Sequence, residues 1–143
     1  MKHETLFYSD AHYSTFPHVV RLGEQHLMVT FRIAGQKSVQ AAKNEQVTHH
    51  ESDSGIAVVE SFDNGKSWDQ DSFRIVYQGS MGVNDPALTV LKKGKILLRF
   101  AGLEVLLSKE RSKLTSPLIS SREEHGLVAG MLGNFVMSSD DDG

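Results

Sequence analysis

The side chains of this 143-residue sequence that could do acid–base or metal chemistry include 18 carboxylates of Asp and Glu and seven histidines. There is no cysteine, which excludes thiolate nucleophiles, thiolate metal sites and disulfides. Among the histidines only His49 and His50 are adjacent, and strand neighbours point to opposite faces, so no metal site is predicted. Glu51 and Asp53 follow directly, and a partly buried carboxyl group can act as a general acid. A solvated polar loop is the alternative interpretation of residues 49–53.

The composition and charge of the chain limit the kinds of partner that we expect it to bind. Apolar residues make up 39% of the chain and charged residues 23%, which is typical of a soluble globular protein. The net charge is −3 and no basic cluster is present, so we expect no nucleic-acid partner. No apolar run approaches the roughly 20 residues of a membrane span, and residues 1–5 lack an apolar signal core. We expect no cofactor and a cytoplasmic chain, or a secreted or periplasmic one if the parent gene is longer.

Short apolar segments separated by turn residues predict a mostly β structure. The predicted strands are residues 16–22, 26–33, 55–61, 73–77, 86–91 and 95–100. The first four form two hairpins, which gives four antiparallel strands in sequence order. The last two repeat the first hairpin, because each copy has a proline at the second position of a run that closes on leucine. The long polar connections 34–54 and 108–130 are predicted to be loops, with at most a helical turn in each.

Residues 61–68 have the form Ser-x-Asp-x-Gly-x-x-Trp. Ser61 and Asp63 can bond backbone groups of a turn, Gly65 can take a positive φ, and Trp68 can pack on the sheet. A second match begins 78 positions later with the residues Ser139, Asp141 and Gly143. This motif is the Asp box found on hairpin turns of sialidase-like β-propellers. Its repetition predicts about two blades, the second without its last strand.

The chain resembles the N-terminal third of the exo-α-sialidase (neuraminidase) superfamily. The resemblance lies in the order of four segments, namely residues 13–22, residues 27–32, the Asp box and residues 84–88. The resemblance covers nearly the whole chain. It implies an all-β, partial six-bladed propeller, with blade one at about 13–80 and an incomplete blade two at about 83–143. It also implies hydrolysis of terminal sialic acid with retention, by an arginine clamp, an aspartate acid/base and a tyrosine nucleophile assisted by a glutamate.

The resemblance assigns roles to several positions of this chain. Arg32 and Asp85 correspond to sugar-binding residues, and the alternatives are a surface arginine at a strand end and an Asx turn. Asp53, or Glu51, corresponds to the acid/base. Thr15 stands where the family has its first clamp arginine. A neutral hydroxyl does not replace the two parallel hydrogen bonds that a charged guanidinium donates to a carboxylate. The Asp-box residues are assigned to folding, on the propeller face away from the substrate.

The later arginines, the glutamate and the nucleophilic tyrosine belong to blades that this chain does not contain, so a complete catalytic set is not expected. The leading hypothesis is a fragment of a sialidase-like glycoside hydrolase that acts on or binds terminal sugars of glycans. The alternative is a non-catalytic carbohydrate-binding propeller that self-associates into a closed ring through open blade edges, with residues 6–8 supplying a neighbour's missing strand. A third interpretation is a purely structural piece of a propeller.

Overall fold

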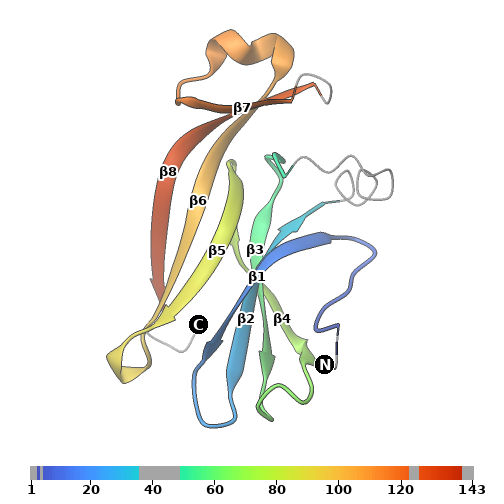
Figure 1. Cartoon of the computed structure of the whole chain (residues 1–143), viewed down its shortest axis with the longest axis vertical. Coiled ribbons are helices and arrows are strands. Elements are labelled where there is room, and N and C mark those ends of the chain that lie inside the picture. The colour runs from blue at the N-terminus through green and yellow to red at the C-terminus, as the bar shows by residue number, and fades with distance from the viewer. Residues whose placement is uncertain (1–2, 4, 36–48, 123–125, 140–143) are drawn as a thin grey trace.

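The computed structural model describes residues 3, 5–35, 49–122 and 126–139. Within these residues eight strands form two four-stranded antiparallel sheets (Figure 1). The first sheet contains β1 (Tyr13–Arg21), β2 (Leu27–Ala34), β3 (Gly55–Ser61) and β4 (Asp69–Gln78), in sequence order. The predicted all-β class and this strand order are confirmed. All seven residues of β3 are buried, because this central strand is covered on both faces.

The second sheet has the order β5-β6-β8-β7. Its strands are β5 (Gly82–Val90), β6 (Ile96–Leu107), β7 (Leu118–Arg122) and β8 (Leu127–Ser139). Two short 3₁₀ helices accompany them, η1 (Lys92–Gly94) in the turn between β5 and β6 and η2 (Ser108–Lys113) after β6. The described strands form two sheets and do not close into a ring.

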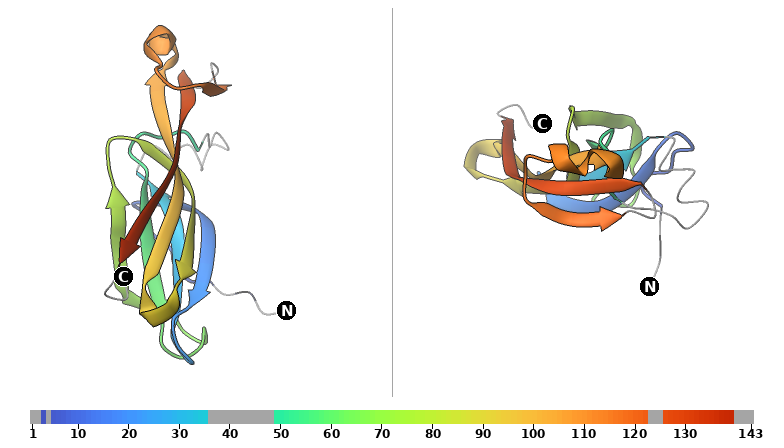
Figure 2. Two further views of the ribbon diagram at one scale, coloured as in Figure 1. Left: turned by 90° about the vertical axis from the view of Figure 1, so that its left-hand side faces the viewer. Right: turned by 90° about the horizontal axis from the view of Figure 1, so that it is seen from above.

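The predicted loop at residues 108–130 is wrong in part, because it contains β7 and the start of β8, whereas η2 is the helical turn that the prediction included. The β6–β8 ladder continues from Leu103 to Leu107 as an arm that projects beyond the first sheet, and β7 adds along its side (Figures 1 and 2). The described segment of β7 is short and starts Leu-Ile-Ser-Ser, so it has no alternation long enough to predict a strand.

Glu104 of β6 holds the segment that follows η2 against the arm. Its carboxylate accepts hydrogen bonds from the backbone N–H and the hydroxyl of both Thr115 and Ser116, at 2.8 to 3.2 Å. These bonds, the Ser116 hydroxyl first among them, lower the pKa of Glu104. Beside them, a Cβ on Gly130 would lie 2.1 Å from the Ser116 hydroxyl oxygen, so this close approach requires glycine.

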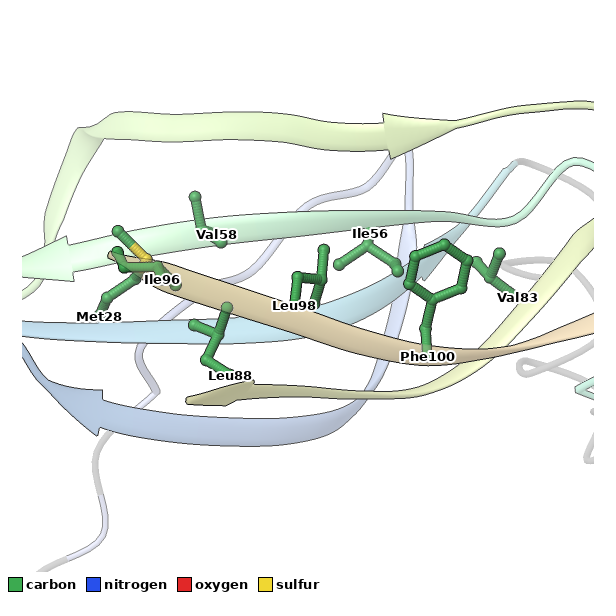
Figure 3. Close-up of a cluster of buried hydrophobic side chains, with 8 residues drawn as sticks. All are labelled: Met28, Ile56, Val58, Val83, Leu88, Ile96, Leu98 and Phe100. Atoms are coloured by element: carbon green, nitrogen blue, oxygen red, sulfur yellow. The ribbon is translucent and has the colours of Figure 1, made fainter. Parts of the chain in front are cut away.

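The core lies between the two sheets, where alternate residues of β2 and β3 meet β5 and β6 (Figure 3). This inter-sheet cluster consists of Met28, Ile56, Val58, Val83, Leu88, Ile96, Leu98 and Phe100. The intervening residues of β2 and β3 form a second cluster on the other face of the first sheet. Leu6, Phe7 and Trp68 cover that face, and the ring of Phe7 lies 4.8 Å from that of Phe73. In this structure residues 6 and 7 therefore pack on their own first sheet.

Candidate functional site

The hairpin turn between β3 and β4 is built by side-chain hydrogen bonds at residues 61–68. The Asp63 carboxylate accepts bonds from the Lys66 and Ser67 backbone N–H groups at 2.9 Å and from the Ser67 hydroxyl at 2.6 Å. The Ser61 hydroxyl donates to Asp63 and accepts from the Gly65 N–H, each at 2.9 Å. Gly65 has φ +83°, which favours glycine. Of the second motif, Ser139 pairs with Ile96, while Asp141 and Gly143 lie outside the described residues.

The Asp63 carboxylate in this turn is expected to make the stability of the fold depend on pH. Hydrogen bonds, chiefly from Ser67, lower the pKa of Asp63 from 3.8 to about 2. A depressed pKa in the folded state contributes stability that is present above pH 4 and is lost as the pH falls through about 2. We expect the melting temperature of the parent to fall between pH 5 and pH 2, and that of Asp63→Asn to fall less, in a thermal melt followed by circular dichroism.

The matched control is Asp71→Asn, because Asp71 is exposed and its carboxylate accepts no hydrogen bond among the described residues. This control should keep the parent's pH profile. If the melting temperatures of Asp63→Asn and the parent fell equally between pH 5 and pH 2, the role given to the Asp63 carboxylate would be contradicted.

The first strand of each sheet, β1 or β5, carries the same irregularity, and that of β1 lies at the opposite end of the first sheet from this turn. The register of β1 shifts between Thr15 and His18, and that of β5 between Asn84 and Ala87. Phe16 and Asp85 occupy the two bulges with φ values of +56° and +51°, and each precedes a proline. Such a backbone costs about 1–3 kcal/mol per residue and is concentrated at functional sites in proteins. The predicted repeat of the first hairpin in the second sheet therefore includes the strained residue before the proline.

Arg32 lies beside the β1 bulge and is fully buried. Its Nε–H donates to the backbone oxygen of Val83 at 2.8 Å, and its Nη2 forms an ion pair with the Glu51 carboxylate. The hydroxyl of Ser54 ties the same segment to β5, because it donates to the Glu51 backbone oxygen at 2.9 Å and accepts from the Val83 N–H at 2.8 Å. The alternative of a surface arginine is thus excluded for Arg32. The structure brings together Arg32 and Glu51, two of the predicted residues.

Three buried polar atoms around Arg32 have no hydrogen-bond partner among the described residues. They are Nη1 of Arg32, Oγ1 of Thr15 and Oδ1 of Asn84. Thr15 is directly opposite Arg32 in the β1–β2 register, and Asn84 follows the Val83 that binds the guanidinium. Buried polar groups without partners are rare in folded proteins, since each costs about 1–3 kcal/mol. The β1–β2 register and the Arg32–Val83 hydrogen bond make the three residues neighbours, so these unsatisfied groups belong to one buried region of the fold.

Asp53 and Asp85 are exposed, whereas the guanidinium of Arg32 is buried. No hydrogen bond joins either of them to Arg32 in the part of the chain that the structure describes. Asp53 lines a groove of about 330 Å³ between residues 50–53 and the arm, together with Glu51 and Glu110. The pKa of Glu110 is lowered, chiefly by its hydrogen bond from Lys113. His49 packs near this end of β1, with its ring 5.0 Å from that of Phe16 and 6.0 Å from that of Tyr13.

Sequence reasoning missed two members of this site. Ser54 is fully buried between Glu51 and Val83, but a single serine before an apolar strand carries no signal of that contact. Asn84 precedes an Asp-Pro pair at the place where Thr15 precedes Phe-Pro, and this internal alignment was the available clue.

Two negative findings apply to the described ranges. They hold no group of three or more His, Asp or Glu side chains placed to bind a metal ion. None of their helical segments is long and apolar enough to cross a membrane.

Two four-stranded antiparallel sheets packed against each other define an all-β protein. No model of a known family matches the chain, and no curated protein matches it. Among solved structures it is similar to a protein of unknown function from Dyadobacter fermentans DSM 18053, with a TM-score of 0.75 and 25% identity. The match covers 96% of this chain and 35% of that one, so the chain spans about a third of the length of that protein.

Proposed function

We propose that the chain forms the sugar-binding side of a sialidase-like glycoside hydrolase propeller, with Arg32 and Asp85 as the residues that contact a terminal sugar. The observation that carries the proposal is the buried guanidinium of Arg32, whose Nη1 lacks a partner beside the partnerless Thr15 Oγ1 and Asn84 Oδ1. Sugar hydroxyls are donors and acceptors at once, so they suit a site that offers both kinds of group. The Asp-box turn and the repeated hairpin support the choice of family.

The two carboxylates near Arg32 take different roles in this proposal. Glu51 is engaged by the guanidinium, so it orients Arg32. Asp53 is exposed in the groove beside it and is the carboxylate left for proton transfer. Thr15 in place of a clamp arginine leaves the site without a bidentate partner for a sugar carboxylate at that position. A neutral terminal sugar therefore fits these residues as well as sialic acid does.

Sugar binding to the 143-residue chain tests the proposal. We expect sialyllactose or lactose to shift the amide NMR signals of the β1 and β5 bulges, with a dissociation constant of about 1 mM, or about −4 kcal/mol. Asp85→Asn should weaken binding about tenfold, a loss of about 1.4 kcal/mol, with an unchanged melting temperature. Asp71→Asn, far from the bulges in the sequence, serves as the control and should bind like the parent.

Loss of folding and of binding together in Asp85→Asn would identify Asp85 as an Asx-turn residue. The absence of any shift with both sugars, in a chain whose NMR spectrum shows a folded core, would contradict the proposed function.

A further inference from the structure

The turn between β3 and β4 contains a pair of residues, Asn64 and Gly65, that is chemically labile in a flexible chain. Of the four asparagines in the sequence, Asn64 alone precedes a glycine. Glycine has no side chain to shield its backbone nitrogen, which attacks Cγ of the asparagine. The new N–Cγ bond forms, the Cγ–Nδ2 bond breaks, and the amide nitrogen leaves as ammonia with the proton of the Gly65 N–H. Water then hydrolyses the resulting succinimide ring to aspartate or isoaspartate.

In the folded chain the exposed side chain of Asn64 is anchored by the neighbouring turn, between β1 and β2. Nη2 of Arg21 donates to Oδ1 of Asn64 at 2.7 Å. Arg21 is itself fixed, because its Nη1 donates to the backbone oxygens of Gly23 at 3.4 Å and Glu24 at 2.7 Å. The Asn64 backbone N–H also donates to the Gln25 oxygen, at 2.8 Å. The two turns lie at the same end of the first sheet (Figure 1), and the first turn holds both the side chain and the backbone of Asn64.

The attacking nitrogen, that of Gly65, is also engaged. Its N–H donates to the Ser61 hydroxyl at 2.9 Å, and that hydroxyl donates to the Asp63 carboxylate at 2.9 Å. The nitrogen has to lose this proton before it can attack. Asp63 is a weak base, since its hydrogen bonds lower its pKa from 3.8 to about 2. These bonds therefore hold the proton on the nitrogen and do not remove it.

The backbone of the pair is held in one conformation as well. Asn64 has φ +62° and Gly65 has φ +83°, so both residues are left-handed. The succinimide nitrogen carries no proton, so ring closure breaks the bond from Gly65 to Ser61. The side chain of Asn64 has to turn toward that nitrogen against the bond from Arg21. The reaction therefore requires local opening of the turn.

We propose that Asn64–Gly65 is a deamidation site that the folded turn keeps closed, with Arg21 and Ser61 as the residues that close it. Modification proceeds from molecules in which these hydrogen bonds are broken, so its rate measures how often the turn opens. The inference does not depend on sugar binding.

The product would prevent the turn from closing again. Isoaspartate inserts a methylene group into the main chain at position 64. That position lies between the Asp63 carboxylate and the Lys66 and Ser67 N–H groups that the carboxylate binds. The longer main chain cannot keep these bonds in their present geometry, so a single modification removes the contacts that build the turn.

Incubation of the 143-residue chain at neutral pH tests this inference. Mass spectrometry of proteolytic peptides measures the fraction of Asn64 converted to an acid. We expect the folded parent to deamidate at least tenfold more slowly than the same chain unfolded in urea. Arg21→Ala removes the anchor of the side chain, and Ser61→Ala removes the acceptor of the Gly65 N–H. Each variant, still folded by circular dichroism, should deamidate at Asn64 about tenfold faster than the folded parent.

A second arginine–asparagine pair supplies the matched control. The exposed Arg99 donates to Oδ1 of Asn134 at 3.1 Å, and Asn134 precedes Phe135. Because the phenylalanine side chain shields its own backbone nitrogen, Arg99→Ala should produce no deamidation at Asn134 and should leave the rate at Asn64 unchanged. Arg21→Lys keeps the charge but not the forked guanidinium, so it should also speed the reaction and replaces Arg21→Ala if that variant does not fold.

Equal rates in the folded and the urea-unfolded parent would overturn the inference, because the turn would then give no protection. A folded Arg21 variant that reacts at the parent's rate would also overturn it. A folded Arg21 variant that reacts more slowly would show that the guanidinium activates Cγ for attack, which is the opposite of the proposed role.

Discussion

Phe100→Ala is expected to lower the free energy of unfolding by about 3–5 kcal/mol, the cost of truncating a buried phenylalanine and leaving a cavity. Phe100 is 1% exposed in the inter-sheet cluster. Its ring lies 4.8 Å from that of Tyr77 in the first sheet and 5.8 Å from that of Phe135 in the second. The side chain thus joins the two sheets, and its loss weakens their contact as well as the local packing.

Urea unfolding followed by tryptophan fluorescence measures this effect, since the chain has one tryptophan, Trp68, packed on the first sheet. Phe135→Ala is the matched control, because the Phe135 ring stacks on the same Phe100 but is 38% exposed and should cost much less. Equal losses for the two variants would show that the sheets are not held together through Phe100.

Arg32→Met is expected to lower the free energy of unfolding by about 3–5 kcal/mol, because it removes the buried guanidinium that pairs with the Glu51 carboxylate. The Arg32 side chain is fully buried and that of Glu51 is 12% exposed, so water does not replace the lost interaction. Adding Glu51→Gln to Arg32→Met also removes the charge of Glu51 and should recover part of the loss. Urea unfolding of both single variants and of the double variant provides the complete cycle.

A surface pair serves as the control for this cycle. Lys113 is 70% exposed and pairs with Glu110 in η2, so Lys113→Met should change stability little. A double variant Arg32→Met/Glu51→Gln no more stable than Arg32→Met would contradict the account of a coupled buried pair.

Several elements were predictable because their signals are local. The runs of branched and aromatic residues in β2 and β3 predicted strands, and the hairpin turns before β2 and after β3 contain the expected glycines, Gly23 and Gly65. The first sheet follows sequence order, since neighbouring hairpins pair with each other. β7 was not predicted, because its place beside β8 depends on the ladder that β6 and β8 form beyond the first sheet.

The candidate site was predictable only in part. Arg32, Asp53 and Asp85 were chosen by residue type and by resemblance, and the first lies buried whereas the other two are exposed. This difference in exposure follows from which face of a strand or which side of a loop each residue occupies in three dimensions. The assignment of sugar-binding roles to Arg32 and Asp85 stays a prediction.

By itself, the sequence determined the β class, the repeated hairpin and the turn at residues 61–68, because each depends on residues near one another in the chain. Only the tertiary structure decided that Arg32 is buried against Val83 and Glu51, which lie 51 and 19 positions away from it in the sequence, respectively. The structure likewise decided that β7 pairs with β8 only between Leu127 and Gly130, since this depends on how far β6 and β8 extend beyond the first sheet. The physical reason is common to both: burial and strand pairing are properties of distant segments brought together by packing, and no local pattern encodes them.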